Sequence, residues 1–237
     1  MPEIKIDKII RSRRKSIALV VSADAELVVR APTRMTLDDI KDLVFRKSSW
    51  INKKRNWILK NGALAKAKEF KDGEEFLYLG ENYKLKIESR DNIKLDDFLY
   101  WPAKYLNDSR LKSDFKGSQK PDFSRGKIIA WYKQEAKGTI TRRANFYSRL
   151  TGWKFKSISI TSAKTRWGSC GTKGSINFAW KLIMAPLRVI DYVVVHELAH
   201  LVARNHSAKF WDEVRNILPD YKIRRTWLND NRMRFKI

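Results

Sequence analysis

All three histidines of this 237-residue chain lie within eleven positions, in the segment VVVHELAHLVARNHSAKFW. His196 and His200 are four residues apart, so on an α-helix they lie one turn apart on the same face. Both imidazoles can then bind one Zn²⁺ ion at the usual zinc–nitrogen distance of about 2.0–2.1 Å. The flanking residues are apolar, which indicates a buried helix. The segment therefore predicts a metal site inside a globular domain.

A third ligand requires the chain to turn after His200. On a straight helix His206 would lie about 9 Å further along the axis, too far away to share the ion. Arg204-Asn205 can end the helix, because asparagine tolerates the left-handed conformation, and Ser207 is a suitable N-cap for the next one. We therefore expect His196, His200 and His206 to hold one zinc ion per chain.

Glu197 follows the first histidine, one step around the helix from the metal-binding face. A carboxylate at that position can reach a water molecule at the metal without ligating the ion, as the general base of metallopeptidases does. Three histidines suffice as protein ligands, so Cys170 is not expected to bind metal. The pattern predicts a zinc hydrolase with Glu197 as its catalytic base.

The segments RWGSC, APLRVIDYVVV, HELAH and NHSAKFW together resemble the YgjP-like metal-dependent hydrolases, which are related to SprT-like and WLM zinc peptidases. These motifs cover about residues 160–230, while the N-terminal hairpin and Leu79–Tyr83 fit more loosely. The resemblance implies a minimal, gluzincin-like zincin core with the three histidines as ligands and Glu197 as base. The spacing also matches metzincins, but Ala203 replaces their glycine and no Met-turn candidate is present.

The distribution of apolar residues predicts an α+β fold in two parts. Residues 1–115 are expected to be β-rich, with a hairpin at 16–30, one long helix at 37–59 capped by Thr36, and short strands at 76–79, 83–87 and 98–101. The polar segment between Asn107 and Ser124 separates them from a catalytic domain at 120–237. That domain is expected to run helix, hairpin, helix, helix, at residues 128–150, 153–161 with 175–183, 187–204 and 208–218.

The loop KTRWGSCGTKG of this second hairpin is the candidate substrate-binding element. The edge of the hairpin would pair with an extended substrate backbone, and Arg166 would face a carbonyl, carboxylate or phosphate. A purely structural interpretation stays open, in which Trp167 packs beneath the helix, Gly168 allows a tight turn and Arg166 pairs with a nearby acid. The candidate binding residues are Arg166, Trp167, Gly168 and Ser169.

The chain is strongly basic, with 50 Lys and Arg against 26 Asp and Glu and a formal net charge of +24. The excess is greatest in residues 121–180, which hold twelve basic and two acidic residues. Such a field attracts polyanions, so DNA or a nucleotide is an expected partner of the basic face at Lys133–Arg149. A basic surface that only confers solubility is the alternative.

Three functions are compatible with these features. The first is a zinc metallopeptidase that acts on a polypeptide, and basic charge could also recruit it to DNA. The second hydrolyses a phosphoanhydride with the same metal and base, as in the UTP pyrophosphatase role attached to YgjP-like proteins. The third is a nucleic-acid-binding module with a structural zinc, although such a module has no need for Glu197.

The sequence also favours a cytoplasmic location. A single cysteine fits a reducing compartment. The N-terminus offers no apolar run of signal-peptide length, and no segment approaches the roughly 18 apolar residues of a membrane span. We therefore expect no membrane association, and the oligomeric state is not predicted.

Overall fold

The computed structural model describes residues 4–22, 24–61, 68–106, 123–235 and 237. They form a mixed α+β structure, with six α-helices and three small sheets among the described residues. The chain divides into two compact units, and the boundary between them precedes Lys68. Each unit has its own apolar core.

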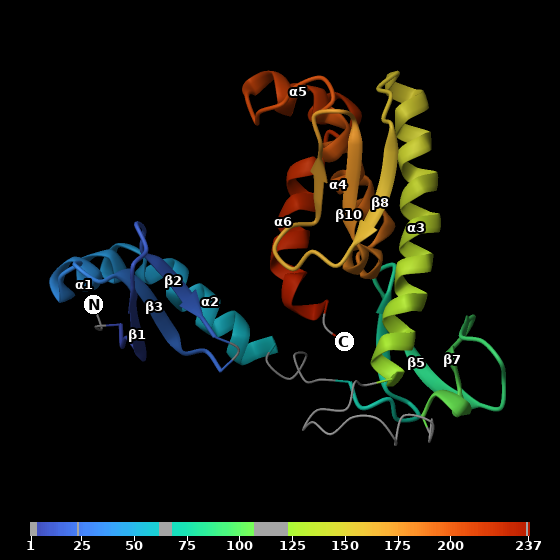
Figure 1. Ribbon diagram of the computed structural model, residues 1–237, viewed down its shortest axis with the longest axis horizontal. Helices are drawn as coiled ribbons and strands as arrows, with labels where there is room; N and C mark the ends of the chain where they lie inside the picture. Colours follow the sequence, from blue (N-terminus) through green and yellow to red (C-terminus); the bar gives the residue numbers. More distant parts are fainter. Residues whose placement is uncertain (1–3, 23, 62–67, 107–122, 236) are drawn as a thin grey trace. The chain divides into compact units, whose positions relative to one another are not determined.

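The first unit is a three-stranded sheet with two helices (Figure 1). Strands β1 (Lys8–Ser12), β2 (Ala18–Val21) and β3 (Leu27–Pro32) lie in the order β1-β3-β2, with β1 parallel and β2 antiparallel to β3. The predicted hairpin is therefore confirmed, and β1 adds a strand that was not predicted. Alternate residues of β3 are fully buried and form the core with helices α1 (Leu37–Arg46) and α2 (Ser48–Asn61).

The single helix predicted at 37–59 is wrong, because α1 ends before Lys47 and α2 begins at Ser48. The Lys47 N–H bonds to both Leu43 O and Val44 O, which tightens the last turn, and two serines follow. The N-cap prediction is correct. Thr36 Oγ1 accepts the Asp39 N–H at 3.1 Å in a capping box.

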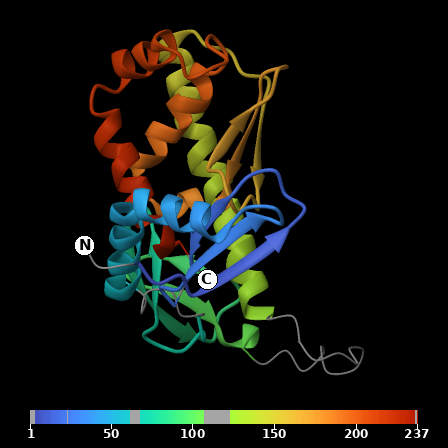
Figure 2. The ribbon, with the colours of Figure 1, turned by 90° about the vertical axis from the view of Figure 1, so that its left-hand side faces the viewer.

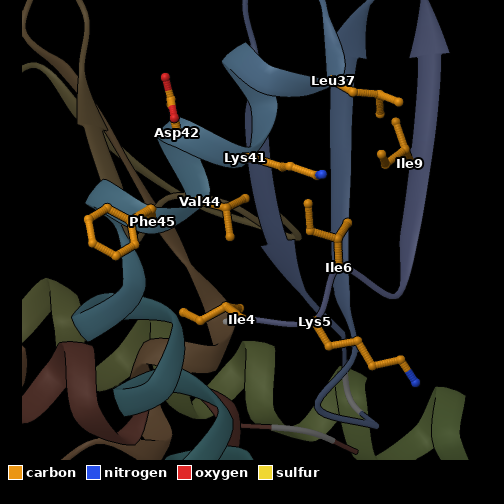
Figure 3. A pocket seen from close by; sticks show the side chains of 9 residues that line it. All are labelled: Ile4, Lys5, Ile6, Ile9, Leu37, Lys41, Asp42, Val44 and Phe45. Carbon is orange, nitrogen blue, oxygen red and sulfur yellow. The ribbon is translucent and has the colours of Figure 1, made fainter. Parts of the chain in front are cut away.

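A cavity of about 660 Å³, lined by six apolar and three charged residues, opens in the first unit (Figure 3). One wall is the N-terminal segment with Ile4, Ile6 and Ile9, and the other is α1 with Leu37 and Phe45. No histidine lines this cavity, so the expected metal site lies elsewhere.

The second unit begins with a four-stranded sheet in the order β4-β5-β7-β6. Its strands are β4 (Glu75–Tyr78), β5 (Glu81–Glu88), β6 (Lys94–Leu95) and β7 (Leu99–Pro102). The turn between β4 and β5 donates two backbone hydrogen bonds to the 3-10 helix η4 (Trp180–Met184), from Leu79 N to Ile183 O and from Gly80 N to Met184 O. A β carbon on Gly80, whose φ is +93°, would lie 2.7 Å from Pro186 Cγ, so only glycine fits there.

This packing groups residues 68–106 with the C-terminal half of the chain. The Tyr132 hydroxyl donates to Leu77 O at 2.8 Å, and Tyr78 bonds to Glu135 at 2.9 Å, so α3 (Phe123–Thr151) holds β4. The sequence analysis grouped these strands with the N-terminal part, which differs from this arrangement. The boundary that it placed at residues 115–120 lies outside the described residues.

A second three-stranded sheet follows α3, in the order β8-β10-β9. Strands β8 (Ser157–Thr161) and β10 (Ser175–Ala179) are parallel, so the predicted hairpin of these two strands is wrong. Residues 162–174 are long enough for the crossover of about a dozen residues that parallel strands need. The antiparallel partner of β10 is β9 (Gly168–Cys170), which comes from the predicted loop.

The remaining helices are α4 (Leu187–Ala199), α5 (Ala208–Ile217) and α6 (Tyr221–Asn231). Helix α4 contacts α3, α5, α6 and β9, and its residues from Val189 to Val195 are buried. Figures 1 and 2 show α3 and α4 on the same side of the β8-β10-β9 sheet. No described helix is long and apolar enough to span a membrane.

Candidate metal centre

Helix α4 presents the first two histidines and ends earlier than predicted. Its last residue is Ala199, and His200 is the C-cap with φ −65°, whereas the sequence predicted a helix to residue 204. The chain turns through bonds from Leu201 N to Leu198 O and from Ala203 N to Ala199 O. Asn205 does not take the left-handed conformation, so that expected mechanism for the turn is wrong.

The turn brings His206 back to the two helical histidines. Each of the three offers a ring nitrogen, and these nitrogens all lie within 4.8 Å of one another. The Nε2 atoms of His196 and His206 are 3.1 Å apart. Two nitrogens bound to one tetrahedral zinc ion lie about 3.4 Å apart, given bonds of about 2.1 Å. The three side chains could therefore hold one metal ion with little movement.

The protonation chemistry of the rings fits a bound cation. Burial lowers the pKa of His196 to about 3, and the neighbouring His200 and His206 act in the same direction. Burial also lowers the pKa of His200. The Nδ1 of His200 lies 3.2 Å from Ala203 O, so an Nδ1–H tautomer would leave Nε2 with its lone pair free. A lowered pKa favours the neutral imidazole, which is the form of histidine that binds metal, at His196 and His200.

Helix α5 supplies an apolar backing for the three rings. The ring of Phe210, which is fully buried, has its centroid 4.5–4.9 Å from those of all three histidines. Trp211 stacks on His206 at 5.7 Å and on Tyr221 of α6 at 5.2 Å. These aromatic residues of α5 therefore fix the rotamers of the candidate ligands in addition to filling the core.

The Glu197 side chain packs against Gly168 of β9. This side chain is buried, and a β carbon built on Gly168 would lie only 2.5 Å from its Oε1 atom. Burial raises the pKa of Glu197 to about 7, against the opposing charge of Arg166. A carboxyl group that titrates near neutral pH can both accept and donate a proton there.

The four candidate binding residues have different surroundings. Trp167 and Gly168 line a cavity of about 230 Å³ that also contains His196 and Glu197. The Trp167 ring additionally packs edge-on against Phe235 at 5.3 Å, so the functional and structural interpretations both apply to it.

Arg166 and Ser169 do not line that cavity. Arg166 is exposed, although its charge acts on Glu197. The Ser169 hydroxyl accepts a bond from the Asn177 side chain of β10 at 3.4 Å, which is a contact within the sheet.

Three polar residues of the cavity wall were not predicted. They are Tyr192 of α4 and, from α6, Arg225 and Asn229. Helix α6 itself was missed, although Tyr221 and Leu228, seven residues apart, are both buried and mark an inward face. That spacing after Pro219-Asp220 is the signal that could have revealed the helix.

An ion pair fixes α4 against α3. Arg143 donates from Nε and Nη2 to the two carboxylate oxygens of Asp191, at 2.5 and 2.9 Å. Asp191 is buried and lies five residues before His196 on α4. This bidentate pair holds the helix that carries the first two histidines in a fixed position on α3.

A sequence model of the family described as "YgjP-like, metallopeptidase domain" matches residues 15–231. The chain is also similar to the crystal structure of the metallopeptidase zymogen of Pyrococcus abyssi abylysin, at 23% identity and a TM-score of 0.36. That alignment covers 38% of this chain and 90% of the other. No curated protein matches the sequence.

Proposed function

Because the chain belongs to the YgjP-like metallopeptidase family, we propose that it is a zinc-dependent peptidase in which Glu197 is the general base. The observation that supports this most directly is the position of Glu197. Its buried carboxylate lies in the wall of the same cavity as His196, next to the three-histidine group. A purely structural metal site has no use for a buried acid at that position.

His196, His200 and His206 would hold the ion. A bound Zn²⁺ supplies a Lewis acid toward a peptide carbonyl and toward water. Glu197 accepts the proton of the attacking water and donates it to the departing amine. Gly168 leaves room for this carboxylate, while the close packing of β9 restricts its movement.

The edge of β9 offers a place for the substrate backbone. β9 pairs with β10 on one side, and its other side pairs with no described strand. An extended polypeptide could add to this edge through main-chain hydrogen bonds, next to Glu197. This geometry favours a polypeptide over a nucleoside triphosphate, since we find no phosphate-binding loop pattern in residues 168–174.

The test compares three substrates on the same zinc-loaded protein: casein, a DNA-bound protein and UTP. We expect cleavage of polypeptide that is lost after chelation and restored by zinc. Glu197→Gln is the matched control for contaminating activity. Efficient UTP hydrolysis without any polypeptide cleavage would show that the phosphoanhydride alternative is correct.

We also propose that the protein associates with nucleic acid through α3. Exposed cations are spread over the solvent-facing surface of this helix, which we call the basic face of α3: Lys133, Lys137, Arg142 and Arg149. Arg143, which the sequence assigned to the same surface, instead bonds to Asp191. The basic face therefore consists of fewer cations than the sequence suggested.

A further inference from the structure

Helix α6 contributes two polar side chains to the cavity beside the histidines. Arg225 and Asn229 are four residues apart, so they lie one turn apart on the same face of the helix. Both line the cavity of about 230 Å³ together with His196 and Glu197. Neither belongs to the three-histidine group, and neither was predicted from the sequence.

Arg225 lacks an acidic partner among the described residues. Its guanidinium lies 5.2 Å from the centre of the Trp211 ring, and it forms no ion pair or hydrogen bond with a described side chain or backbone atom. The preceding Arg224 differs, since it bonds to both Asp220 and Arg188 O. The ring of Trp211 supports the guanidinium while leaving its donors available.

The cavity around Arg225 suits an anionic group. Among the described residues that line it, Glu197 is the only acidic one, and that carboxylate packs against Gly168. The remaining walls include Trp167, Tyr192 and Leu228, which lower the local dielectric constant and strengthen electrostatic interactions. A cavity volume of about 230 Å³ is large enough to hold an acidic side chain.

We propose that Arg225 and Asn229 recognise an acidic side chain of the polypeptide substrate, next to the bond that is cleaved. The planar guanidinium can pair with a carboxylate through two parallel hydrogen bonds, and the Asn229 amide can donate a third. This inference rests on the proposed peptidase function and names the substrate class of the same site. Arg225 is a specificity-determining residue here, and it takes no part in proton transfer.

The experiment uses two series of fluorogenic peptides. In each series one position flanking the cleaved bond is varied at a time, and it is Glu in the first series and Gln in the second. At one position the zinc-loaded wild type should cleave the Glu peptide with about tenfold higher kcat/KM. A tenfold ratio corresponds to the low end of the energy of a hydrogen bond to a charged group. We expect the low end because Arg225 is exposed to solvent. Arg225→Gln should reduce this ratio to near one, and Arg225→Glu should favour a Lys peptide.

Lys222→Gln is the matched control, since Lys222 is an exposed cation of the same helix that does not line the cavity. It should keep the tenfold ratio. A wild type that cleaves both peptides equally would overturn the inference and leave the peptidase function intact. An equal loss on both peptides in Arg225→Gln would also overturn it, because Arg225 would then serve the reaction or the fold.

Binding separates failure of the inference from failure of the proposed function. If no peptide is cleaved, fluorescence anisotropy of the same peptides still tests recognition. Tighter binding of the Glu peptide to wild type than to Arg225→Gln supports the inference on its own. If both peptides bind alike while UTP binding falls in Arg225→Gln, the recognised anion is a phosphate and the inference is wrong.

Discussion

Gly168→Ala tests the contact between β9 and the candidate base. A β carbon at this position would lie 2.5 Å from Oε1, 2.6 Å from Cγ and 2.7 Å from Cδ of Glu197. Gly168 does not lie in the left-handed region, so alanine can adopt the backbone conformation without strain. The three atoms nearest to the added β carbon all belong to Glu197, so the substitution acts first through packing against that side chain.

The size of the effect follows from these distances. Ordinary contacts begin at 3.4 Å, so the atoms must separate by about 1 Å. Rotation of the terminal carboxylate cannot relieve the conflict, because Cγ is affected as well. Overpacking of this kind costs about 1–3 kcal/mol. For a chain of this size that corresponds to a fall in Tm of about 2–12 °C. Displacement of a base by about 1 Å can lower the rate on the order of 10²-fold.

The assay measures kcat/KM on the best peptide substrate, zinc content by elemental analysis, and Tm. We expect full zinc content, a lower Tm and about a hundredfold loss of activity. Gly126→Ala in α3 is the matched control, since among the described residues no atom beyond its chain neighbours and its own helix backbone lies within 4 Å of the added β carbon. It should keep wild-type activity and stabilise the helix by about 0.5–1 kcal/mol.

A double mutant identifies the route of the effect. If Gly168 acts through Glu197, then Gly168→Ala should cause no further loss of kcat in a Glu197→Gln background, because the two changes affect one group. Wild-type turnover and Tm in Gly168→Ala would refute the reasoning, since Glu197 could not then lie against β9 as the structure shows.

Four further predictions concern the base, the metal, the Arg143–Asp191 ion pair and the basic face of α3. Glu197→Gln should keep zinc and the fold while losing on the order of 10²–10⁴ in kcat, and wild-type turnover would exclude it as the base. His200→Ala should lose most of its zinc, and added zinc should no longer raise its Tm as it does for wild type. Arg143→Met should leave the buried Asp191 unpaired and destabilise the protein by about 3 kcal/mol in urea unfolding; an unchanged midpoint would contradict this. Reversing the charges of the basic face of α3 should flatten the salt dependence of DNA binding, and no binding by wild type even at low salt would sink this proposal.

The grouping of the three histidines was predictable because the information is local. Two of them share a helix face through a four-residue spacing, and the third follows after a short turn. The mechanism of that turn was not predictable from composition. The helix ends at Ala199 through backbone hydrogen bonds from Leu201 and Ala203, so the left-handed asparagine was unnecessary. The residue types at Arg204-Asn205 correctly indicated a turn before His206, but the helix ends five residues earlier, at Ala199.

Strand pairing was harder to predict than strand location. Alternation of apolar residues placed β8 and β10 approximately, but the same pattern suits parallel and antiparallel neighbours. The decision depends on β9, whose three residues, Gly168 to Cys170, show no apolar alternation of their own. A strand that short is defined by its hydrogen bonds to β10, which are contacts between segments and leave no periodic signal.

Helix α6 shows where the prediction of a site from motifs ends. Arg225 is an exposed basic residue among many in this chain, and nothing in the sequence separates it from a solvated cation. Its significance comes from tertiary packing, which places α6 against α4 and the Arg225 side chain in the same cavity as Glu197. Gly168 is the converse case, because its role is to leave space that the Glu197 side chain occupies. Residues that provide chemistry can therefore be read from spacing, whereas those that shape or select the substrate are recognised only from what the fold places beside them.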